Sequence, residues 1–280
     1  MRVVFFGCGY LGYNLSSFLR KDFDVSIYGL KSPYTDKASW FKEMDCFNEE
    51  LLRQEKLKDA IIIDTVSIIG VNAKSDNEAE TLGKLKMRYE NLFRVLKEQG
   101  IKRYVFFSSG GTIYGDSEVA IDENHSLNPK NLYARSKELL EGVLKESGLD
   151  YLILRPTNPF GGYQENDNGQ GVIPILISKA IKQEVFEMWV DSSSTRDYIY
   201  IDDFGNALKL LLEKDINNEA VNISSGVGIS LEKVINTIEK ELGIPVLIER
   251  KESAVALVKN IVLANTKLKT LCGYEPSGGF

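Results

Sequence analysis

Short apolar runs alternate with amphipathic segments along the first half of the chain. Five of the runs have the length of buried strands: Val3–Phe6, Val25–Tyr28, Ile61–Ile63, Tyr104–Phe107 and Tyr151–Leu154. Between them, apolar residues recur at helical spacing, most clearly from Leu82 to Leu96 before Gly100. Strands that are apolar on both faces and separated by helices are typical of a parallel sheet covered on both sides. We therefore expect an α/β fold with a doubly wound parallel sheet.

The pattern changes after Pro156. The stretch GGYQENDNGQG, residues 161–171, is glycine-rich and polar, as expected of a domain boundary or a loop over a cleft. Shorter elements follow it: helices near residues 173–181, 204–212 and 231–238, and a strand at 221–223. We therefore predict a larger domain of residues 1–158, to which 196–212 return, and a smaller C-terminal domain of residues 159–195 and 213–280.

The composition is that of an ordinary globular protein, because 43% of the 280 residues are hydrophobic and 26% are charged. The formal net charge is −6, which leaves no broad basic field for nucleic acid or for an anionic membrane surface. No segment is apolar over the ~20 residues that a membrane-spanning helix requires. We therefore expect neither nucleic acid nor a membrane as a partner.

Cysteine and histidine usage bears on the compartment and on metals. The cysteines Cys8, Cys46 and Cys272 are odd in number and widely spaced, so they do not form a disulfide framework. This usage indicates a reducing, cytoplasmic location. The single histidine, His125, argues against a histidine-based zinc site, and we predict no metal.

Three glycines stand where the first predicted strand meets the first helix. Gly7, Gly9 and Gly12 form a GxGxxG pattern in that strand–turn–helix context. Gly7 suits a tight turn, Gly9 a close approach of the backbone to pyrophosphate, and Gly12 close helix–strand packing. The free N–H groups of the helix N-terminus would then face the phosphates. We favour dinucleotide binding here over an ordinary glycine-containing turn, with Tyr10 and Leu11 also at the cofactor.

The end of the second strand leaves the choice of dinucleotide open. It carries no carboxylate for the adenosine ribose, because Gly29 stands where an acidic residue is usual. Lys31 and Ser32 suit a 2′-phosphate and so favour NADP, or they are solvated loop residues. The sequence does not decide between NAD and NADP.

A second group of polar residues has the chemistry of an acid/base site. Tyr133 and Lys137 form YxxxK on a predicted helix, where the i, i+4 spacing puts both on one face. A nearby ammonium would lower the tyrosine pKa and make the phenol an acid/base group. Ser108, Ser109 and Thr112 follow the fourth strand, at the edge of the sheet where ligands bind. The alternatives are a chance surface pair and a self-capping turn.

Together these features resemble the extended short-chain dehydrogenase/reductases that act on nucleotide sugars, the NAD-dependent epimerase/dehydratase group. The resemblance covers nearly the whole chain and implies a Rossmann-like fold with a smaller C-terminal substrate domain. It rests on motifs in the family's order: GCGYLG from Gly7, Asp45-Cys46 at the place of the adenine contact, SSGGTIYG from Ser108, YARSK from Tyr133 after Pro129, LRPTNPFG from Leu154, and RDYIYIDD from Arg196. The tail from Cys272 resembles the late LGxxP segment without the usual final helix, as in a short or truncated variant.

The resemblance implies roles for the site residues. Tyr133 would be the base that removes the sugar hydroxyl proton, and Lys137 would lower its pKa and hold the nicotinamide ribose. Ser108 would join the cofactor contacts. Asn158 and Arg196 would contact the diphosphate of a nucleotide-diphosphate sugar.

More ordinary roles are open for three of the implied site residues. Arg196 would form a salt bridge with Asp197, Asn158 would be a turn residue beside proline, and Asp45 would be a cap. For the assembly, we allow for a homodimer.

One departure from the family touches the chemistry. The usual catalytic Ser or Thr stands four residues before the tyrosine of the YG pair, and here that position is Gly110. If the backbone is extended there, the side chains at 110 and 112 share a face. We therefore expect Thr112, or else Ser109, to replace the missing hydroxyl.

The residues near this position also select among the family's reactions. The chain lacks the Thr-Asp-Glu pattern of the sugar 4,6-dehydratases, and it lacks the glutamate that decarboxylases carry at the place of Thr112. We therefore favour a nucleotide-sugar 4-epimerase that works through a transient 4-keto sugar and a bound nicotinamide cofactor. The alternatives are an NADPH-dependent reductase of a keto-sugar nucleotide, and a non-catalytic NAD(P)-binding regulatory protein.

Overall fold

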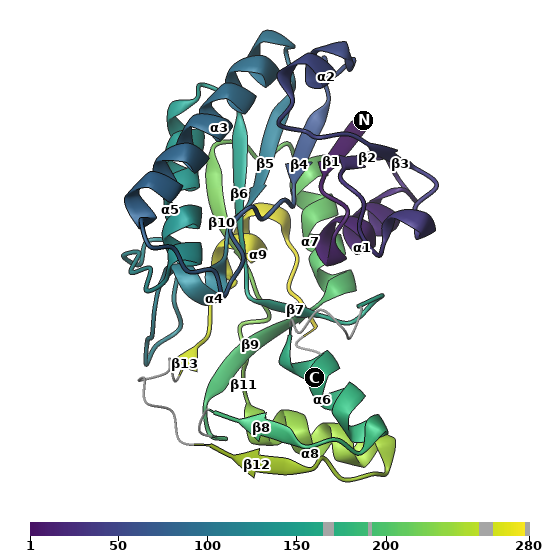
Figure 1. The fold of residues 1–280 in the computed structure, drawn as a ribbon, viewed down its shortest axis with the longest axis vertical. Helices are drawn as coiled ribbons and strands as arrows, with labels where there is room; N and C mark the ends of the chain where they lie inside the picture. Colours follow the sequence, from purple (N-terminus) through teal and green to yellow (C-terminus); the bar gives the residue numbers. More distant parts are fainter. Residues whose placement is uncertain (165–170, 190–191, 252–259, 278–280) are drawn as a thin grey trace.

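A parallel β-sheet is the central element of the structure, a computed structural model that describes residues 1–164, 171–189, 192–251 and 260–277 (Figure 1). Within these residues the sheet has seven strands, in the order β10-β6-β5-β4-β1-β2-β3. Their bounds are β1 (Arg2–Phe6), β2 (Asp24–Gly29), β3 (Phe41–Glu43), β4 (Ile61–Asp64), β5 (Arg103–Phe107), β6 (Tyr151–Pro156) and β10 (Glu219–Ile223). The strand order reverses between β1 and β4, which is the mark of a doubly wound sheet and confirms the predicted fold class.

Two hydrophobic cores cover the two faces of this sheet. Val3 and Phe5 of β1 point into one core, and Val4 and Phe6 point into the other, because side chains alternate along a strand. The helices of the first core are α1 (Tyr10–Leu19), α7 (Ile201–Glu213) and α9 (Thr266–Cys272). Those of the second core are α2 (Glu49–Gln54), α3 (Glu78–Glu98) and α5 (Leu132–Glu146). Short apolar runs therefore became fully buried strands, as their pattern predicted.

A smaller part of the molecule lies beyond the carboxyl ends of the strands (Figure 1). Its helices are α6 (Val172–Lys182) and α8 (Leu231–Leu242), which share a core that includes Leu176 and Val234. Among the described residues, β7 (Asn158–Phe160), β9 (Thr195–Tyr200), β11 (Gly228–Ser230) and β13 (Asn260–Ile261) form a second sheet, and β8 (Phe186–Met188) pairs with β12 (Ile248–Arg250). The remaining short elements are η1 (Thr35–Lys37) and α4 (Gly110–Ile113).

Two segments pair differently from what the sequence analysis expected. Strand β10 was assigned to the smaller domain, but it is the edge strand of the main sheet and pairs in parallel with β6. Residues 196–212 were expected to return to the larger domain. Of these, β9 instead pairs with β7, β11 and β13, whereas α7 packs onto α1 as expected. The division of the chain into two domains remains a prediction. Residues 165–170 of the glycine-rich stretch, and 278–280 of the tail, lie outside the described residues.

No helix in the described part of the chain is both long enough and apolar enough to cross a membrane.

Candidate active site

The glycine-rich turn lies between β1 and α1, as predicted. Gly7 has a φ of +92°, which favours glycine, and its N–H donates to Tyr28 O at 2.8 Å. A Cβ on Gly12 would lie 2.1 Å from Gly7 O, so only glycine allows the helix to pack this closely on the turn. A Cβ on Gly9, in contrast, would meet open space. The turn therefore leaves the N-terminus of α1 accessible to a ligand.

A cavity of about 870 Å³ opens at the carboxyl ends of the strands, where the strand order reverses. It brings together most of the residues predicted for the site: Gly7, Gly9, Tyr10, Leu11, Asp45, Cys46, Ser108, Ser109, Thr112, Tyr133, Lys137 and Asn158. Gly12, Lys31 and Arg196 lie outside its lining. Sequence reasoning missed Arg88 and Gln164, which also line the cavity.

Tyr133 and Lys137 lie on the first turns of α5. Asn131 is the N-cap of this helix, and its side chain accepts a hydrogen bond from Ala134 N at 2.8 Å. The Lys137 ammonium is buried, lies 5.7 Å from the centre of the Tyr133 ring and donates to Phe107 O at 2.9 Å. Burial lowers the pKa of Lys137 to about 8, while Asp64 and Glu141 act in the opposite direction. The pair therefore shares one face of α5, as the spacing predicted.

The pKa of Tyr133 differs from the expectation. Burial raises the pKa of Tyr133, and hydrogen bonding to Ser109 only partly opposes the shift. The expected lowering of the Tyr133 pKa by Lys137 is therefore not met. The physical reason is that loss of solvation outweighs the stabilisation of a phenolate at this half-buried position.

The hydroxyl-bearing turn has a different backbone from the one expected. Residues 110–113 form helix α4 with Ser109 as its N-cap, so the side chains at 110 and 112 do not share the face of an extended strand. The helix instead places Thr112 over Ser109, and Thr112 Oγ1 donates to Ser109 Oγ at 2.9 Å. Ser109 in turn acts on Tyr133, whose pKa it lowers. The hydroxyls of Ser109, Thr112 and Tyr133 therefore belong to one wall of the cavity.

Several features fit a dinucleotide. Ser108 Oγ is buried, lines the cavity and has no hydrogen-bond partner among the described residues. The N-cap of α1 is Gly9, which offers no side chain to the N–H groups of the first turn, and that turn carries no acidic side chain. A buried orphan hydroxyl and a free helix N-terminus both favour a ligand with phosphate and hydroxyl groups.

The far end of the cavity lies beside β2. Asp45 accepts from Phe47 N at 3.0 Å and lies 3.6 Å from the Arg88 guanidinium, which stacks on the Phe47 ring at 4.3 Å. Asp45 thus lines the cavity and also closes its own turn, so both expected roles are compatible. Cys46 is buried and its thiol donates to Tyr28 O at 3.3 Å. Arg88 comes from the long helix α3, and no local sequence signal marks it.

The two residues considered for a 2′-phosphate are engaged elsewhere. The Lys31 side chain is 75% exposed and its ammonium lies 3.5 Å from the Glu43 carboxylate at the end of β3. The Ser32 hydroxyl donates to Cys8 O and accepts from Tyr34 N at 3.2 Å.

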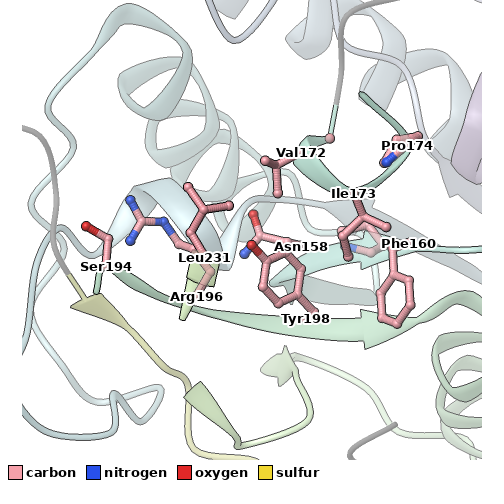
Figure 2. Close-up of a pocket in the computed structure, with 11 residues that line it drawn as sticks. Asn158, Phe160, Val172, Ile173, Pro174, Ser194, Arg196, Tyr198 and Leu231 are labelled. Carbon is pink, nitrogen blue, oxygen red and sulfur yellow. The ribbon is translucent and has the colours of Figure 1, made fainter. Parts of the chain in front are cut away.

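Arg196 lines a second, adjoining pocket of about 290 Å³ (Figure 2). Asn158 belongs to both cavities, and its amide donates to Asp197 O at 2.8 Å. The Arg196 guanidinium donates to Thr195 O at 2.8 Å, and burial lowers its pKa. Asp197 is the next residue on β9 and turns to the other face, where its carboxylate accepts from Ser225, Gly226 and Leu263.

The walls of this pocket are largely apolar and come from β7, α6, β9 and α8. Figure 2 shows Leu231 beside Arg196, Val172 and Tyr198 on either side of Asn158, and Ile173 next to Phe160. A pocket with apolar walls, a half-buried guanidinium and an amide has the chemistry to hold an anionic group attached to a ring.

Comparisons with known proteins agree with this geometry. The chain is 30% identical over 253 residues to dTDP-4-dehydro-6-deoxyglucose reductase of Escherichia coli. The aligned region covers 88% of this chain and 78% of that protein. It is 26% identical over 307 residues to UDP-glucose 4-epimerase of Halalkalibacterium halodurans, with 96% of this chain and 89% of that protein covered.

Solved structures share the fold. The UDP-glucose 4-epimerase of Thermus thermophilus in complex with NAD matches with a TM-score of 0.86 at 22% identity, over 100% of this chain and 95% of that one. The UDP-glucose 4-epimerase of Thermotoga maritima with UDP-glucose matches with a TM-score of 0.85 at 24% identity. The match covers 99% of this chain and 94% of that one. The sequence profile of the NAD dependent epimerase/dehydratase family matches residues 6–224. This chain therefore belongs to the NAD dependent epimerase/dehydratase family.

Proposed function

We propose that the protein is a nucleotide-sugar 4-epimerase that works with a bound NAD. One observation carries this proposal: Tyr133 and Ser109 line the same cavity as the glycine-rich turn and Asn158. Asn158 also lines the pocket of Arg196. A sugar held between Tyr133 and Asn158 would therefore have its nucleotide in the Arg196 pocket and its reactive carbon facing the cofactor.

The residues that would hold the cofactor are those of the large cavity. The turn at Gly7 and Gly9 would hold the pyrophosphate, Ser108 and Lys137 the nicotinamide side, and Asp45 the adenosine side. When bound, NAD supplies the oxidant, because its nicotinamide accepts a hydride from the sugar carbon and can return it.

NAD is favoured over NADP by the ion pair of Lys31. Its ammonium is paired with Glu43 outside the cavity lining, and the Ser32 hydroxyl is already bonded within its own loop. A 2′-phosphate would have to displace Glu43, and two anions would then compete for one exposed lysine. The family's description also names NAD.

The side chains would move one proton and hold the charge that this movement creates. The Tyr133 oxygen takes the proton of the sugar C4 hydroxyl as that carbon is oxidised, and returns it when the carbon is reduced on its other face. The hydrogen bond from Ser109 stabilises the charged phenolate, and Lys137 adds a positive charge on the same side. Thr112 orients Ser109 through its own hydroxyl.

Turnover of UDP-glucose tests the proposal. Purified protein is incubated with UDP-glucose alone, and UDP-galactose is measured by chromatography. We expect interconversion without added cofactor, because an epimerase regenerates its NAD in each cycle and retains it through purification. No conversion of UDP-sugars or dTDP-sugars, by a protein that holds NAD, would contradict the proposal.

A reductase of a keto-sugar nucleotide is the second candidate, and the 30% identity to dTDP-4-dehydro-6-deoxyglucose reductase favours it. A reductase consumes one reduced cofactor for each sugar, so it needs NADH or NADPH from solution. Loss of absorbance at 340 nm with dTDP-4-dehydro-6-deoxyglucose, and no epimerisation of UDP-glucose, would support this candidate. If neither reaction occurs, the regulatory alternative is favoured.

A further inference from the structure

A turn that follows β7 is fastened to the first helix of the main sheet. Gly161 and Gly162 have φ values of +88° and +61°, so the chain reverses sharply before Tyr163. The Tyr10 hydroxyl donates to Gly161 O at 3.0 Å. Tyr10 is the first residue of α1 and also lines the cofactor cavity, so this bond joins two segments that are 151 positions apart.

Asn14, one helical turn after Tyr10, binds the same turn through both ends of its amide. Its Nδ2 donates to Tyr163 O at 2.8 Å, and its Oδ1 accepts from Tyr163 N at 2.8 Å. Nδ2 also donates to Tyr10 O at 2.8 Å, which fixes the orientation of the side chain. The amide thus satisfies both backbone groups of Tyr163, as a neighbouring strand would. No residue with a Cβ fits at Gly162, because that atom would lie 2.5 Å from Asn14 Oδ1.

The Tyr163 ring adds a contact with the loop after β2. It meets Tyr13 and Tyr34 edge-on, with ring centres 5.9 Å and 5.8 Å apart. The Lys37 ammonium lies 4.3 Å from the centre of the Tyr163 ring. Such aromatic and cation–π contacts are attractive and add to the hydrogen bonds from Asn14. The turn is therefore held on α1 and on the loop that follows β2, both of which border the dinucleotide side of the cavity.

The last residue of this turn is Gln164, which lines the cofactor cavity and also an apolar groove of about 410 Å³ beside α6. Gly171, the N-cap of α6, lies next to it, because a Cβ there would be 3.0 Å from Gln164 Nε2. The start of α6 also provides Val172 and Ile173 to the pocket of Arg196. Gln164 thus belongs to the wall of the cofactor cavity and lies beside the start of α6, which lines the pocket of Arg196.

We propose that Tyr10 and Asn14 are positioning residues, which fasten the turn of residues 161–164 to α1 and thereby fix the wall of the nucleotide-sugar site. This inference rests on the proposed function for the identity of the ligand. Because Tyr10 and Asn14 touch backbone atoms of the turn and not the reacting group, their loss weakens ligand affinity and leaves the chemical step almost unchanged.

Hydrogen exchange and UDP binding test this inference in the protein as purified with its cofactor. Asn14→Ala removes the amide that binds Tyr163, and Tyr10→Phe removes only the hydroxyl that binds Gly161 O. Asn91→Ala removes an exposed amide on α3 and is the matched control. The Tyr163 N–H should exchange about tenfold faster in Asn14→Ala and at the wild-type rate in Asn91→Ala. The Kd for UDP should rise about tenfold in Asn14→Ala and severalfold in Tyr10→Phe. Asn14→Ala, which lies outside the lining of the cofactor cavity, should keep its content of cofactor.

The outcomes separate this inference from the proposed reaction. If UDP-glucose is turned over, KM rises in Asn14→Ala while kcat stays within about twofold, as expected for lost positioning. Unchanged exchange at Tyr163 in Asn14→Ala, or an unchanged Kd for UDP in both variants, would overturn the inference. If exchange and UDP affinity change as predicted but UDP-glucose is not epimerised, the positioning role stands and the proposed reaction fails. Should Asn14→Ala not fold, Tyr10→Phe decides alone.

Discussion

Thr112 Oγ1 lies 2.9 Å from Ser109 Oγ, with Ser109 at the N-cap of α4 and Thr112 three positions later. Ser109 also lowers the pKa of Tyr133, which lines the same cavity on α5. This arrangement exists because residues 110–113 are helical, and three positions along a helix return to the same face. The hydroxyl role that relatives assign to one side chain would here belong to a pair.

The first prediction separates the two members of the pair. Ser109→Ala should cut kcat by ~10²–10³, because it removes the hydroxyl that favours the charged form of Tyr133. Thr112→Val should cut kcat only by about tenfold, since Thr112 acts through Ser109. Both variants should retain their cofactor and melt close to the wild-type temperature. A larger loss in Thr112→Val than in Ser109→Ala would show that Thr112 contacts the sugar directly.

The second prediction concerns the proposed base. Tyr133→Phe removes the ionisable oxygen and keeps the ring, so the fold and the bound cofactor should be retained while turnover falls by ~10²–10⁴. Tyr151→Phe, at the start of β6, is the matched control and should keep full turnover. Near-normal turnover in Tyr133→Phe on an identified substrate would exclude Tyr133 as the base.

The third prediction follows from the buried ammonium of Lys137, whose pKa is lowered from 10.5 to about 8 by burial. Below about pH 8 the folded protein holds this charge at a cost, and the unfolded chain retains its proton up to about pH 10.5. The unfolded state therefore binds more protons between these values, and this group makes folding more favourable as the pH rises.

Thermal melting of the cofactor-free protein tests this sign. The measured quantity is the melting temperature of wild type minus that of Lys137→Met, because the other titratable groups affect both proteins equally. This difference should rise between pH 8 and pH 10. Turnover should show the opposite trend, because deprotonation of Lys137 removes the charge that supports the Tyr133 phenolate. A difference in melting temperature that is flat across this range would contradict the lowered pKa.

The fourth prediction concerns cofactor choice. Lys31→Ala should leave the content of bound NAD and the turnover unchanged, because Lys31 is exposed and paired with Glu43. Glu43→Ala should instead improve binding of NADP, since the lysine is then released for a 2′-phosphate. Fluorescence titration with both dinucleotides measures the two affinities. A strong loss of cofactor affinity in Lys31→Ala would indicate NADP as the natural ligand.

The sequence predicted those features that depend on local spacing. The buried strands could be recognised because both faces of the sheet are covered, and Tyr133 and Lys137 because helical spacing puts them on one face. The glycine-rich turn could be placed because Gly7 and Gly12 meet within six positions of each other.

Features that depend on distant pairing could not be predicted in the same way. The partners of strand β9, which are β7, β11 and β13, come from three separate regions of the chain. The pairing of β10 with β6 likewise depends on long-range contacts and not on the pattern of residues 219–223. The helical start at Gly110 was missed because two glycines have low intrinsic helix propensity, and tertiary packing overrides it.

The last prediction returns to Gly110, the position at which relatives would carry the catalytic hydroxyl. A serine there would restore the family pattern, but its Cβ would lie 2.7 Å from Arg155 O and 3.1 Å from Pro156 O, both backbone atoms of β6. It would also lie 2.4 Å from Leu263 Cδ1, the end of a flexible side chain. Gly110→Ser should therefore destabilise the fold by ~1–3 kcal/mol and not raise turnover.

Two further variants separate the sources of this strain. Adding Leu263→Ala to Gly110→Ser relieves the contact with the Leu263 side chain but not the contacts with the two carbonyls. Leu263→Ala alone leaves a cavity, and its cost is subtracted. After this subtraction, the free energy of unfolding should return only in part towards the wild-type value. Gly111→Ser is the control, because the nearest atom to its Cβ would be Asn158 Oδ1 at 3.9 Å, and it should melt near the wild-type temperature. Urea unfolding measures the free energy of unfolding of each variant. A Gly110→Ser protein that is as stable as wild type and turns over faster would mean that the position is open to a side chain and that a hydroxyl there takes part in turnover.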